Sequence, residues 1–429
     1  MELSSYTLII AASIIIIVSF LFNSISKKTN IPSVLMLIVL GVILKAIMDY
    51  YGVRSINFFP ALEVLGIVGL IMIVLEAALD LKLKKEKLPT IGKATAVALL
   101  GLVASVFAAA GIIWVLVPGM SWTQALLYGT PLSILSSAIM IPSVGNLIEE
   151  KKEFLIYESA LSDILGIMLF YFLLGQADPA FEGNAIVSFF TSLGITIAVA
   201  LMASYALILV FQRIESHAKL FLLIAILLLL YAVGKLYHLS PLIIILIFGL
   251  TISNMNLFFK GFLKKLLKVD EAKKIYDNLH MVTLETAFVV RTFFFVIFGI
   301  TILLSELLSI EVIVTSIALL VSIYLIRFAF LRVFIGNNIK PQVYMAPRGL
   351  ITVLLFYAIP AEYQVASFNS GILLFIIIAT GVIMTWSLIQ DSKNEKKEIT
   401  EQPDNEFLFD KAVMPSMKHN NDDNDEGGL

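Results

Sequence analysis

The sequence contains no cysteine among its 429 residues, so disulfides, thiol chemistry and cysteine-ligated metal sites are excluded. Charge is also scarce, because charged residues make up 14% of the chain, against about 25% in soluble globular proteins. The net charge of −2 argues against binding nucleic acid or another polyanion. Histidines number four, and no pair has the spacing of metal ligands. P-loop and Rossmann glycine patterns are missing, which argues against ATP-driven transport, and we expect no cofactor.

Apolar residues are what the chain has in excess. They make up 59% of the sequence, against about 45–50% in soluble proteins. A single soluble core cannot bury this much apolar surface, so the chain must reside in a lipid bilayer. A soluble enzyme and a disordered scaffold are therefore excluded, and the composition predicts an all-α polytopic membrane protein.

Long apolar runs locate the predicted transmembrane helices, each of which needs roughly 20 mostly apolar residues. Charged or turn-rich breaks divide the chain into about thirteen such runs. They cover residues 6–24, 31–50, 61–80, 91–117, 123–146, 154–175, 185–211, 219–236, 240–257, 282–304, 311–334, 343–361 and 370–390.

The basic residues indicate how these spans are oriented. Lysines and arginines cluster in every second predicted loop, whereas the loops between them hold only Lys45, Arg54 and Lys235. The positive-inside rule then places the N-terminus outside and the C-terminus in the cytoplasm. The first apolar run has no basic residues before it and is long enough to span, so it is not expected to be a signal peptide. A cell membrane is predicted, with a prokaryotic inner membrane as the simplest choice.

Thirteen helices divide into two repeats with a linker helix between them. The first repeat covers about residues 6–175, the linker helix about 185–211 and the second repeat about 219–390. An offset of seven helices reverses the direction of the second repeat, which predicts an inverted repeat. Residues 1–390 would form the membrane domain. The polar residues 391–429 would bury too little apolar surface to fold and are predicted to be a disordered, acidic cytoplasmic tail.

Proline occurs at matching places in the two repeats. Tyr128 and Pro131 in the fifth helix, and Tyr344 and Pro347 in the twelfth, form the same Tyr-x-x-Pro pattern. Proline removes a backbone donor and clashes with the preceding turn, so we expect both helices to break at these prolines. Interrupted spans in corresponding positions indicate the binding site of a secondary transporter. Two ordinary proline kinks are the alternative.

Several ionisable side chains lie inside predicted spans, although a charge at the membrane centre costs at least about 2.5–3.5 kcal/mol. They are Glu76, Glu158, Asp163, Arg291, Arg327 and Arg348. From the 1.5 Å helical rise, Asp163 and Arg291 lie about 14 Å from the cytoplasmic boundary. Glu158 is expected to form a structural ion pair with an arginine. Arg291 either balances the charge of the site or pairs with Glu285 or a carbonyl. Arg348 either balances the charge of the site or snorkels to the inner boundary.

Asp163 is the deepest acid and has hydroxyls beside it. Ser159 precedes it by one helical turn, and Ser162 is its neighbour in sequence. A carboxylate, hydroxyls and the carbonyls of a broken helix can replace the water around a small hard cation. Because burial favours the protonated form of a carboxylate, a proton and a cation can compete for one site. Asp163 is therefore predicted to bind both, a competition that suffices for antiport.

Four short segments on this frame resemble motifs of the cation/proton antiporter superfamily, nearest its sodium/proton exchanger branch. They are Ile73–Asp80, Glu158–Asp163, Tyr324–Arg327 and Pro347–Leu350, in the order found in that branch. The similarity covers about residues 6–390.

The resemblance implies a core of six helices with crossed, broken helices 5 and 12, and a second domain that forms a homodimer. The core would move like an elevator between the two sides of the membrane. Asp163 would carry the cation or proton, assisted by Glu76, Ser159 and carbonyls around Thr130. Glu158 and Arg327 would form the structural ion pair.

Two departures from the family pattern concern the ion. The family usually has asparagine where this chain has Ser162, and Thr-Asp-Pro where it has Gly129-Thr130-Pro131. Without that aspartate, binding is expected to be weaker or less selective for sodium. A neutral residue at position 162 suggests the exchange of one cation for one proton.

The leading hypothesis is a carrier, not an enzyme, that exchanges Na⁺, or else K⁺ or Li⁺, for protons. An alternative is a carrier of an organic anion bound by Arg291 and Arg348, with Asp163 coupling transport to sodium or protons. An intramembrane aspartyl protease would need two facing aspartates, and only Asp163 is deeply placed. Saturable, proton-coupled flux would exclude a receptor or a gated channel.

Overall fold

The computed structural model describes residues 5–29, 31–52, 59–83, 85–177, 185–214, 219–236, 241–261, 265–301, 307 and 309–401. These described residues are predominantly helical and contain no strand, which confirms the all-α class. Nine segments of the described chain are long and apolar enough to cross a membrane.

The longer helices have the following bounds. They are α1 (Ser5–Thr29), α2 (Ser33–Tyr50), α3 (Phe59–Asp80), α4 (Leu88–Leu116), α7 (Glu149–Ala177), α8 (Ala185–Phe211), α9 (Lys219–Leu236), α13 (Val269–Thr301), α14 (Ile310–Phe334) and α16 (Gly371–Glu401). The shorter ones are η1 (Lys85–Lys87), α5 (Trp122–Ser133), α6 (Ser137–Ser143), α10 (Pro241–Ser253), α11 (Met255–Phe258), η3 (Gln342–Tyr344), α15 (Leu350–Tyr357) and η4 (Ala361–Tyr363). Each predicted span overlaps at least one of these helices. The count of thirteen and the inverted repeat remain predictions.

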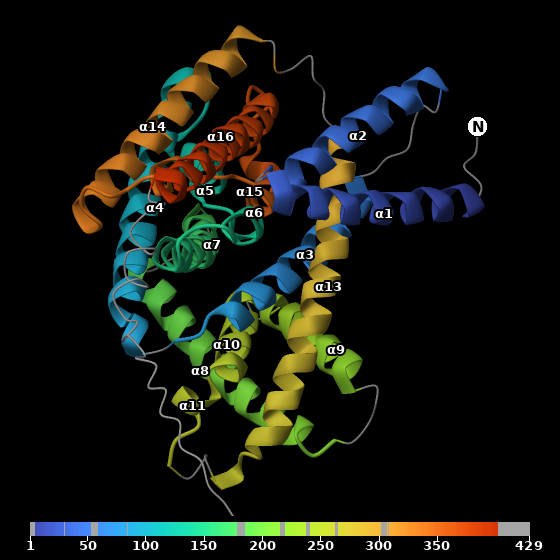
Figure 1. Cartoon of the computed structure of the whole chain (residues 1–429), viewed down its shortest axis with the longest axis vertical. Coiled ribbons are helices and arrows are strands. Elements are labelled where there is room, and N and C mark those ends of the chain that lie inside the picture. Colours follow the sequence, from blue (N-terminus) through green and yellow to red (C-terminus); the bar gives the residue numbers. More distant parts are fainter. Residues whose placement is uncertain are drawn as a thin grey trace, which may run out of the picture.

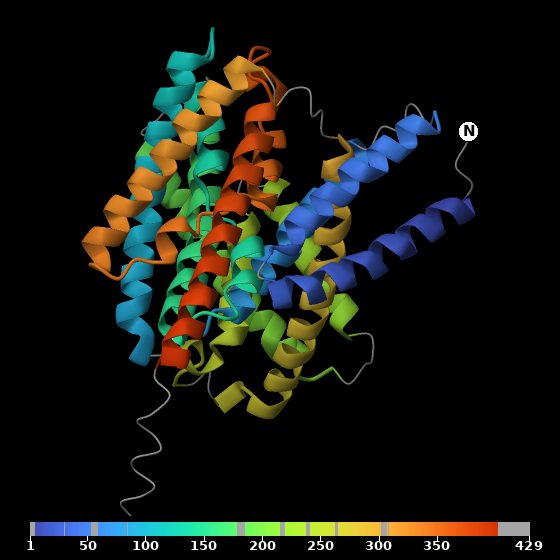
Figure 2. The same ribbon diagram turned by 45° about the horizontal axis from the view of Figure 1, so that its top comes forward.

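The helices pack in two groups. In the first, α4 packs against α5, α7 and α14, and α14 also packs against α16. In the second, α13 packs against α2 and α3, while α10 packs against α3, α8 and α9. The first group lies at the upper left of Figure 1, and the second lies at the right and below. In the rotated view of Figure 2, α14 and α16 of the first group again lie to the left of α2 and α13 of the second. The half-helices α5, α6 and α15 lie on the side of the first group that faces the second.

Two glycines let α2 and α13 pack closely. A Cβ atom on Gly41 would lie 2.2 Å from the carbonyl oxygen of Val296, and one on Gly299 would lie 2.4 Å from that of Ile38. Small residues bring helix backbones together in membranes, where helices associate through packing rather than through the hydrophobic effect.

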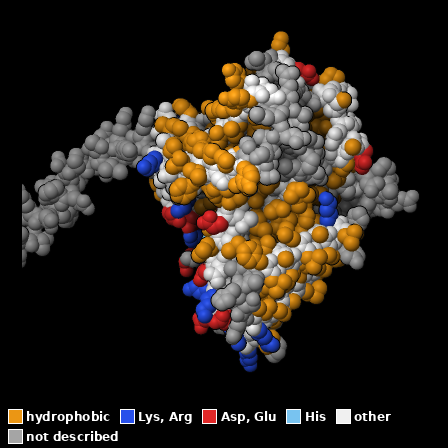
Figure 3. All heavy atoms as spheres, turned by 90° about the vertical axis from the view of Figure 1, so that its right-hand side faces the viewer, with side chains coloured by type: hydrophobic (Ala, Val, Ile, Leu, Met, Phe, Trp, Pro, Cys, Tyr) orange, Lys and Arg blue, Asp and Glu red, His pale blue; other side chains and the backbone are white. Residues whose placement is uncertain are grey.

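The molecular surface is largely apolar. Hydrophobic side chains cover much of the described face in Figure 3, and most of the charged ones lie along its left and lower-left edge. Along α1, side chains such as Ile9, Ile17 and Phe20 are each more than half exposed. A surface of this extent is compatible with lipid and not with water.

The last helix differs from the prediction. Residues 391–401, expected to belong to the disordered tail, continue α16 to Glu401. The reason is local, because this stretch contains no proline or glycine to end a helix. The rest of the expected tail, residues 402–429, lies outside the described residues.

Candidate ion-binding site

The fifth predicted span is a broken helix. After α5 ends at Ser133, residues 134–136 have no helical structure, and α6 begins at Ser137. Pro131 lies inside α5, so the break predicted at this proline occurs three residues later. A proline lacks only its own amide donor, and here that loss does not end the helix.

A second break lies against the first. Residues 345–349 are not helical and connect η3 to α15, and Pro347 lies among them. The amide of Ser136 in the first break donates a hydrogen bond to the carbonyl oxygen of Pro347, at 2.9 Å. The two interruptions, far apart in sequence, therefore meet at one point.

Asp163 on α7 contacts the first break. Its Oδ2 accepts a hydrogen bond of 3.0 Å from the amide of Ser137, the first residue of α6. Its Oδ1 is buried and has no hydrogen-bond partner among the described residues. The neighbouring Ser162 accepts a 3.0 Å bond from the amide of Leu135. Because the N-terminus of a helix carries partial positive charge, α6 stabilises an anionic carboxylate at this place.

Two further hydroxyls that the sequence assigned to the ion are buried and bonded to their own helices. Thr130 donates to the carbonyl of Leu126 at 2.7 Å, and Ser159 donates to that of Ile156 at 3.3 Å. Within the described part of the chain, neither makes a hydrogen bond to Asp163. The hydroxyl of Ser136, which the sequence reasoning missed, is buried without a partner in the described structure. Its proximity in sequence to Pro131, where a break was predicted, could have indicated Ser136 as a candidate ligand.

Arg291 links the two groups of helices beside this site, and Glu76 is its partner within the second group. Nη2 of Arg291 on α13 lies 3.4 Å from Oε1 of Glu76 on α3. Nη1 of Arg291 donates a long bond of 3.4 Å to the carbonyl of Ala138 in α6. Oε2 of Glu76 is buried and unbonded among the described residues. Arg291 thus contacts a carboxylate and the short helix that also contacts Asp163.

Glu158 and Arg327 form a buried, two-pronged ion pair between α7 and α14. The distances from the two guanidinium nitrogens to the two carboxylate oxygens are 2.7 and 3.0 Å. Nε of Arg327 also donates to the carbonyl of Gln342 in η3, at 2.8 Å. The pair consequently fixes the segment that leads into the second break.

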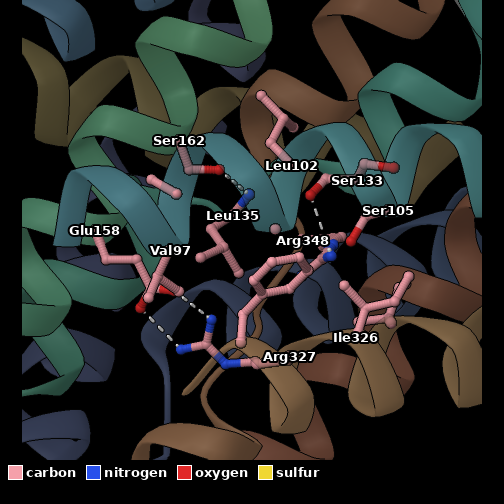
Figure 4. A pocket seen from close by; sticks show the side chains of 14 residues that line it. Val97, Leu102, Ser105, Ser133, Leu135, Glu158, Ser162, Ile326, Arg327 and Arg348 are labelled. Atoms are coloured by element: carbon pink, nitrogen blue, oxygen red, sulfur yellow. Dashed lines mark hydrogen bonds and ion pairs between the residues drawn. The ribbon is translucent and has the colours of Figure 1, made fainter. Parts of the chain in front are cut away.

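Arg348 closes the end of α5, a role that the sequence reasoning missed. Its guanidinium donates to the carbonyls of Leu132, Ser133 and Ala346, at 2.9, 3.2 and 2.7 Å. Figure 4 shows the bond to Ser133. The side chain is 2% exposed, so the expectation that it snorkels to the boundary is wrong. The physical reason is that the last carbonyls of a helix lack intrahelical partners and attract a cation.

A small cavity adjoins these groups. It has a volume of about 30 Å³, which is room for about two water molecules. Hydroxyls and charged side chains line part of its wall; they belong to Ser105, Ser133, Glu158, Ser162, Arg327 and Arg348 (Figure 4). Ser105 on α4 was not predicted, because a serine in a long apolar helix gives no signal in the sequence.

Among the described residues, one acid of the site has no basic side chain that neutralises it. Arg291 pairs with Glu76, Arg327 pairs with Glu158, and Arg348 binds backbone carbonyls. Among the described residues, Asp163 has no basic side chain as a partner. A buried carboxylate in this situation is stable only with a proton or a bound cation.

Comparison with protein families identifies the fold. Residues 12–390 match the family model described as "Sodium/hydrogen exchanger, transmembrane". The chain belongs to the sodium/hydrogen exchanger family. This is a family of membrane transporters and not a class of enzymes, and the exchanger is a multi-pass membrane protein.

Solved structures show the same fold. The exchanger is similar to the structure of the sodium proton antiporter MjNhaP1 from Methanocaldococcus jannaschii at pH 8, with a TM-score of 0.63 and 21% identity. That match covers 89% of this chain and 94% of the other. A second structure of MjNhaP1, an electron-microscopy map, matches with a TM-score of 0.64 and 19% identity, over 94% and 99% of the two chains. Comparison with curated protein sequences gave no match.

Proposed function

We propose that this exchanger moves a monovalent cation, Na⁺ in the first place, in exchange for protons, with Asp163 as the shared site. The observation that carries the proposal is the buried Oδ1 of Asp163, which has no partner among the described residues, on an acid that no basic side chain neutralises. Either a proton or a cation satisfies that oxygen, so binding of one displaces the other.

The remaining ligands come from groups around the break. Ser136 offers a buried, unbonded hydroxyl oxygen, and Ser162, Ser159 and Thr130 keep oxygen lone pairs after the bonds described above. Glu76 supplies a second carboxylate on the opposite group of helices. Oxygen ligands of this kind suit a hard cation such as Na⁺, and also K⁺ or Li⁺.

The charges favour an exchange of one cation for one proton. Asp163 is the single acid of the site without a basic partner among the described residues, and Ser162 beside it is neutral. One negative charge binds one Na⁺ or one proton. The carrier loaded with Na⁺ therefore has the same net charge as the carrier loaded with a proton. Flux at equal ion gradients should then be insensitive to a potassium diffusion potential, and voltage-driven flux would contradict the stoichiometry.

The two helix groups support alternating access by an elevator-type motion. The group with α4, α5, α7, α14 and α16 carries Asp163 and would slide as the core domain. The group with α2, α3, α8, α10 and α13 would form the dimerisation domain of a homodimer. We place the protein in a prokaryotic inner membrane, with its N-terminus outside and its C-terminus in the cytoplasm.

The organic-anion alternative gains no support from the geometry. It needs Arg291 and Arg348 to bind the substrate, but Arg348 donates to three backbone carbonyls and Arg291 contacts Glu76 and Ala138.

Purified protein in liposomes that contain a pH dye tests the proposal. Addition of Na⁺, K⁺ or Li⁺ should change the internal pH in wild type, and the substitution Asp163→Asn should abolish the change. The matched control is Glu149→Gln on the same helix, whose side chain is 69% exposed, and it should transport like wild type. A flat wild-type trace with every cation would overturn the proposal, and organic anions would be tested next.

A further inference from the structure

A groove runs along the outward face of α14, away from the ion site. It has a volume of about 760 Å³ and is bounded by α14, residues 337–340, η3 and α16. Its apolar wall includes Ile317, Val321, Leu325 and Phe328, whose exposed fractions lie between 49% and 63%. These residues recur every three or four positions, so they form one stripe along the helix.

The length of the stripe matches one leaflet of a bilayer. From Ile317 to Arg332 the helix rises by about 22 Å, since each residue adds 1.5 Å. Half of a bilayer measures about 15 Å of hydrocarbon and about 20–22 Å with its headgroups. The apolar part of the groove therefore spans the acyl region, and Arg332 lies at headgroup depth.

The headgroup end of the groove is basic. Arg332 and Lys340 line it, are exposed, and form no ion pair with any described residue. Lys151 on α7 adds a third positive charge, because its Nζ donates to Oδ1 of Asn338 and to the carbonyl of Lys340. Lys151 also interacts electrostatically with Asp391, which leaves Arg332 and Lys340 as the free charges.

We infer that this groove is a binding site for one anionic phospholipid of the cytoplasmic leaflet. An acyl chain lies along the stripe on α14, and the phosphate contacts Arg332 and Lys340. Basic pockets between membrane helices on the cytoplasmic side recognise acidic headgroups in this way. The inference uses the membrane placement and the proposed orientation, and it is independent of which ion is transported.

The groove also contacts the segment that leads to the ion site. Val343 and Tyr344 of η3 line it, and η3 leads directly into the second break. Arg327, the partner of Glu158, holds the same segment through the carbonyl of Gln342. A bound lipid thus packs against the segment that positions Pro347.

Native mass spectrometry of the purified full chain tests the site, with phosphatidylglycerol and phosphatidylethanolamine of identical acyl chains as probes. Wild type should retain one phosphatidylglycerol in preference to phosphatidylethanolamine. Each basic residue at a membrane surface contributes about fivefold to binding of an anionic lipid, so Arg332→Gln with Lys340→Gln should reduce the preference by about 25-fold. The matched control, Lys260→Gln with Lys265→Gln, removes the same charge from another cytoplasmic segment and should keep the preference.

A second variant tests the acyl part of the groove. Leu325→Trp fills the apolar stripe without changing charge and should reduce retention of phosphatidylglycerol at least fivefold. Equal retention of both lipids by wild type would overturn the inference, as would equal behaviour of the groove and control variants. Displacement of the lipid by inorganic phosphate at millimolar concentration would also overturn it, because the site would then bind a free anion.

Discussion

Arg348 illustrates, at the scale of single residues, how a charge becomes stable inside a membrane. Three backbone carbonyls surround its guanidinium, and two of them belong to the end of α5. No carboxylate is needed, because the partial negative charge of a helix C-terminus serves as the counter-ion. The same side chain therefore ends one half-helix and neutralises the negative end of that helix.

Replacing Arg348 with lysine should destabilise the protein although the charge is kept. A lysine has one nitrogen and cannot reach three carbonyls in different directions, and each buried carbonyl left unpaired costs about 1–3 kcal/mol. The midpoint of thermal unfolding in detergent should fall clearly below that of wild type. Arg213→Lys, at an exposed arginine, is the control and should not change it; equal midpoints for both variants would contradict the capping role.

Glu158 and Arg327 should show strong coupling in a double-mutant cycle. Removing one partner leaves a buried charge unpaired, so Glu158→Leu or Arg327→Met alone should cost about 3–5 kcal/mol of stability. The double variant removes both charges and should cost much less than the sum. Thermal or denaturant unfolding in detergent measures each term. Additive effects would show that the 2.7 Å pair contributes no more than its separate side chains.

The broken helices are the feature that matters at the scale of elements. Their existence was predictable from sequence, because Pro131 and Pro347 occur at matching places in apolar spans. The position of the first break was not predictable, because it depends on Arg348 and Pro347, which supply partners to α5 and Ser136 from more than 200 residues away. The local sequence shows that a proline lacks an amide donor. It does not show where the distant hydrogen-bond partners of the broken helix lie in space.

Asp163 shows the same limit within the site. The sequence of α7 showed an acidic side chain inside an apolar span, and it also showed the neighbouring serines. The hydrogen bond from the amide of Ser137 to Oδ2 of Asp163 could not be predicted from the sequence, because it depends on where α6 begins. Similarly, helix periodicity placed Ser159 beside Asp163, whereas its hydroxyl donates to the preceding turn of α7.

The close packing of α2 on α13 should make the stability of the protein sensitive to the size of the residue at position 41. Gly41→Ala places a methyl group where the backbone of α13 lies, so the helices must separate, and we expect a loss of about 1–3 kcal/mol. Gly101→Ala on α4 is the matched control, because a Cβ atom there meets nothing within 4 Å. It should be neutral or slightly stabilising, since alanine favours helix more than glycine does. Unfolding midpoints in detergent compare the two, and a loss in Gly101→Ala of the same size would contradict the explanation.

Division into two packing groups is the feature that matters for the whole molecule. If the first group slides past the second, a link between them should stop transport, whereas a link within one group should not. The absence of native cysteine makes such links specific. A Cβ atom on Gly66 of α3 would lie 2.3 Å from Cδ2 of Leu354 on α15, so these positions connect the groups.

We expect Gly66→Cys with Leu354→Cys to lose cation-evoked pH changes after reaction with a short thiol cross-linker. A reducible linker should restore them. The control pair is Gly129→Cys with Ala109→Cys, within the first group. A Cβ atom on Gly129 would lie 3.4 Å from Cβ of Ala109. Continued transport by the linked Gly66 and Leu354 pair would exclude sliding of one group past the other.

The contact between the two breaks has a consequence for how the protein is synthesised. The carbonyls of α5 that Arg348 satisfies precede it by about 215 residues in the chain. At about 5–20 residues per second, translation takes about 10 to 40 seconds to reach the arginine after α5 has been synthesised. During that interval the end of α5 has exposed carbonyls and the amide of Ser136 has no partner from the second break, so the first half must wait in the insertion machinery or in contact with water. Assembly of this site is therefore a late event of biogenesis, and a chain truncated before Arg348 should be a preferred substrate for membrane proteases.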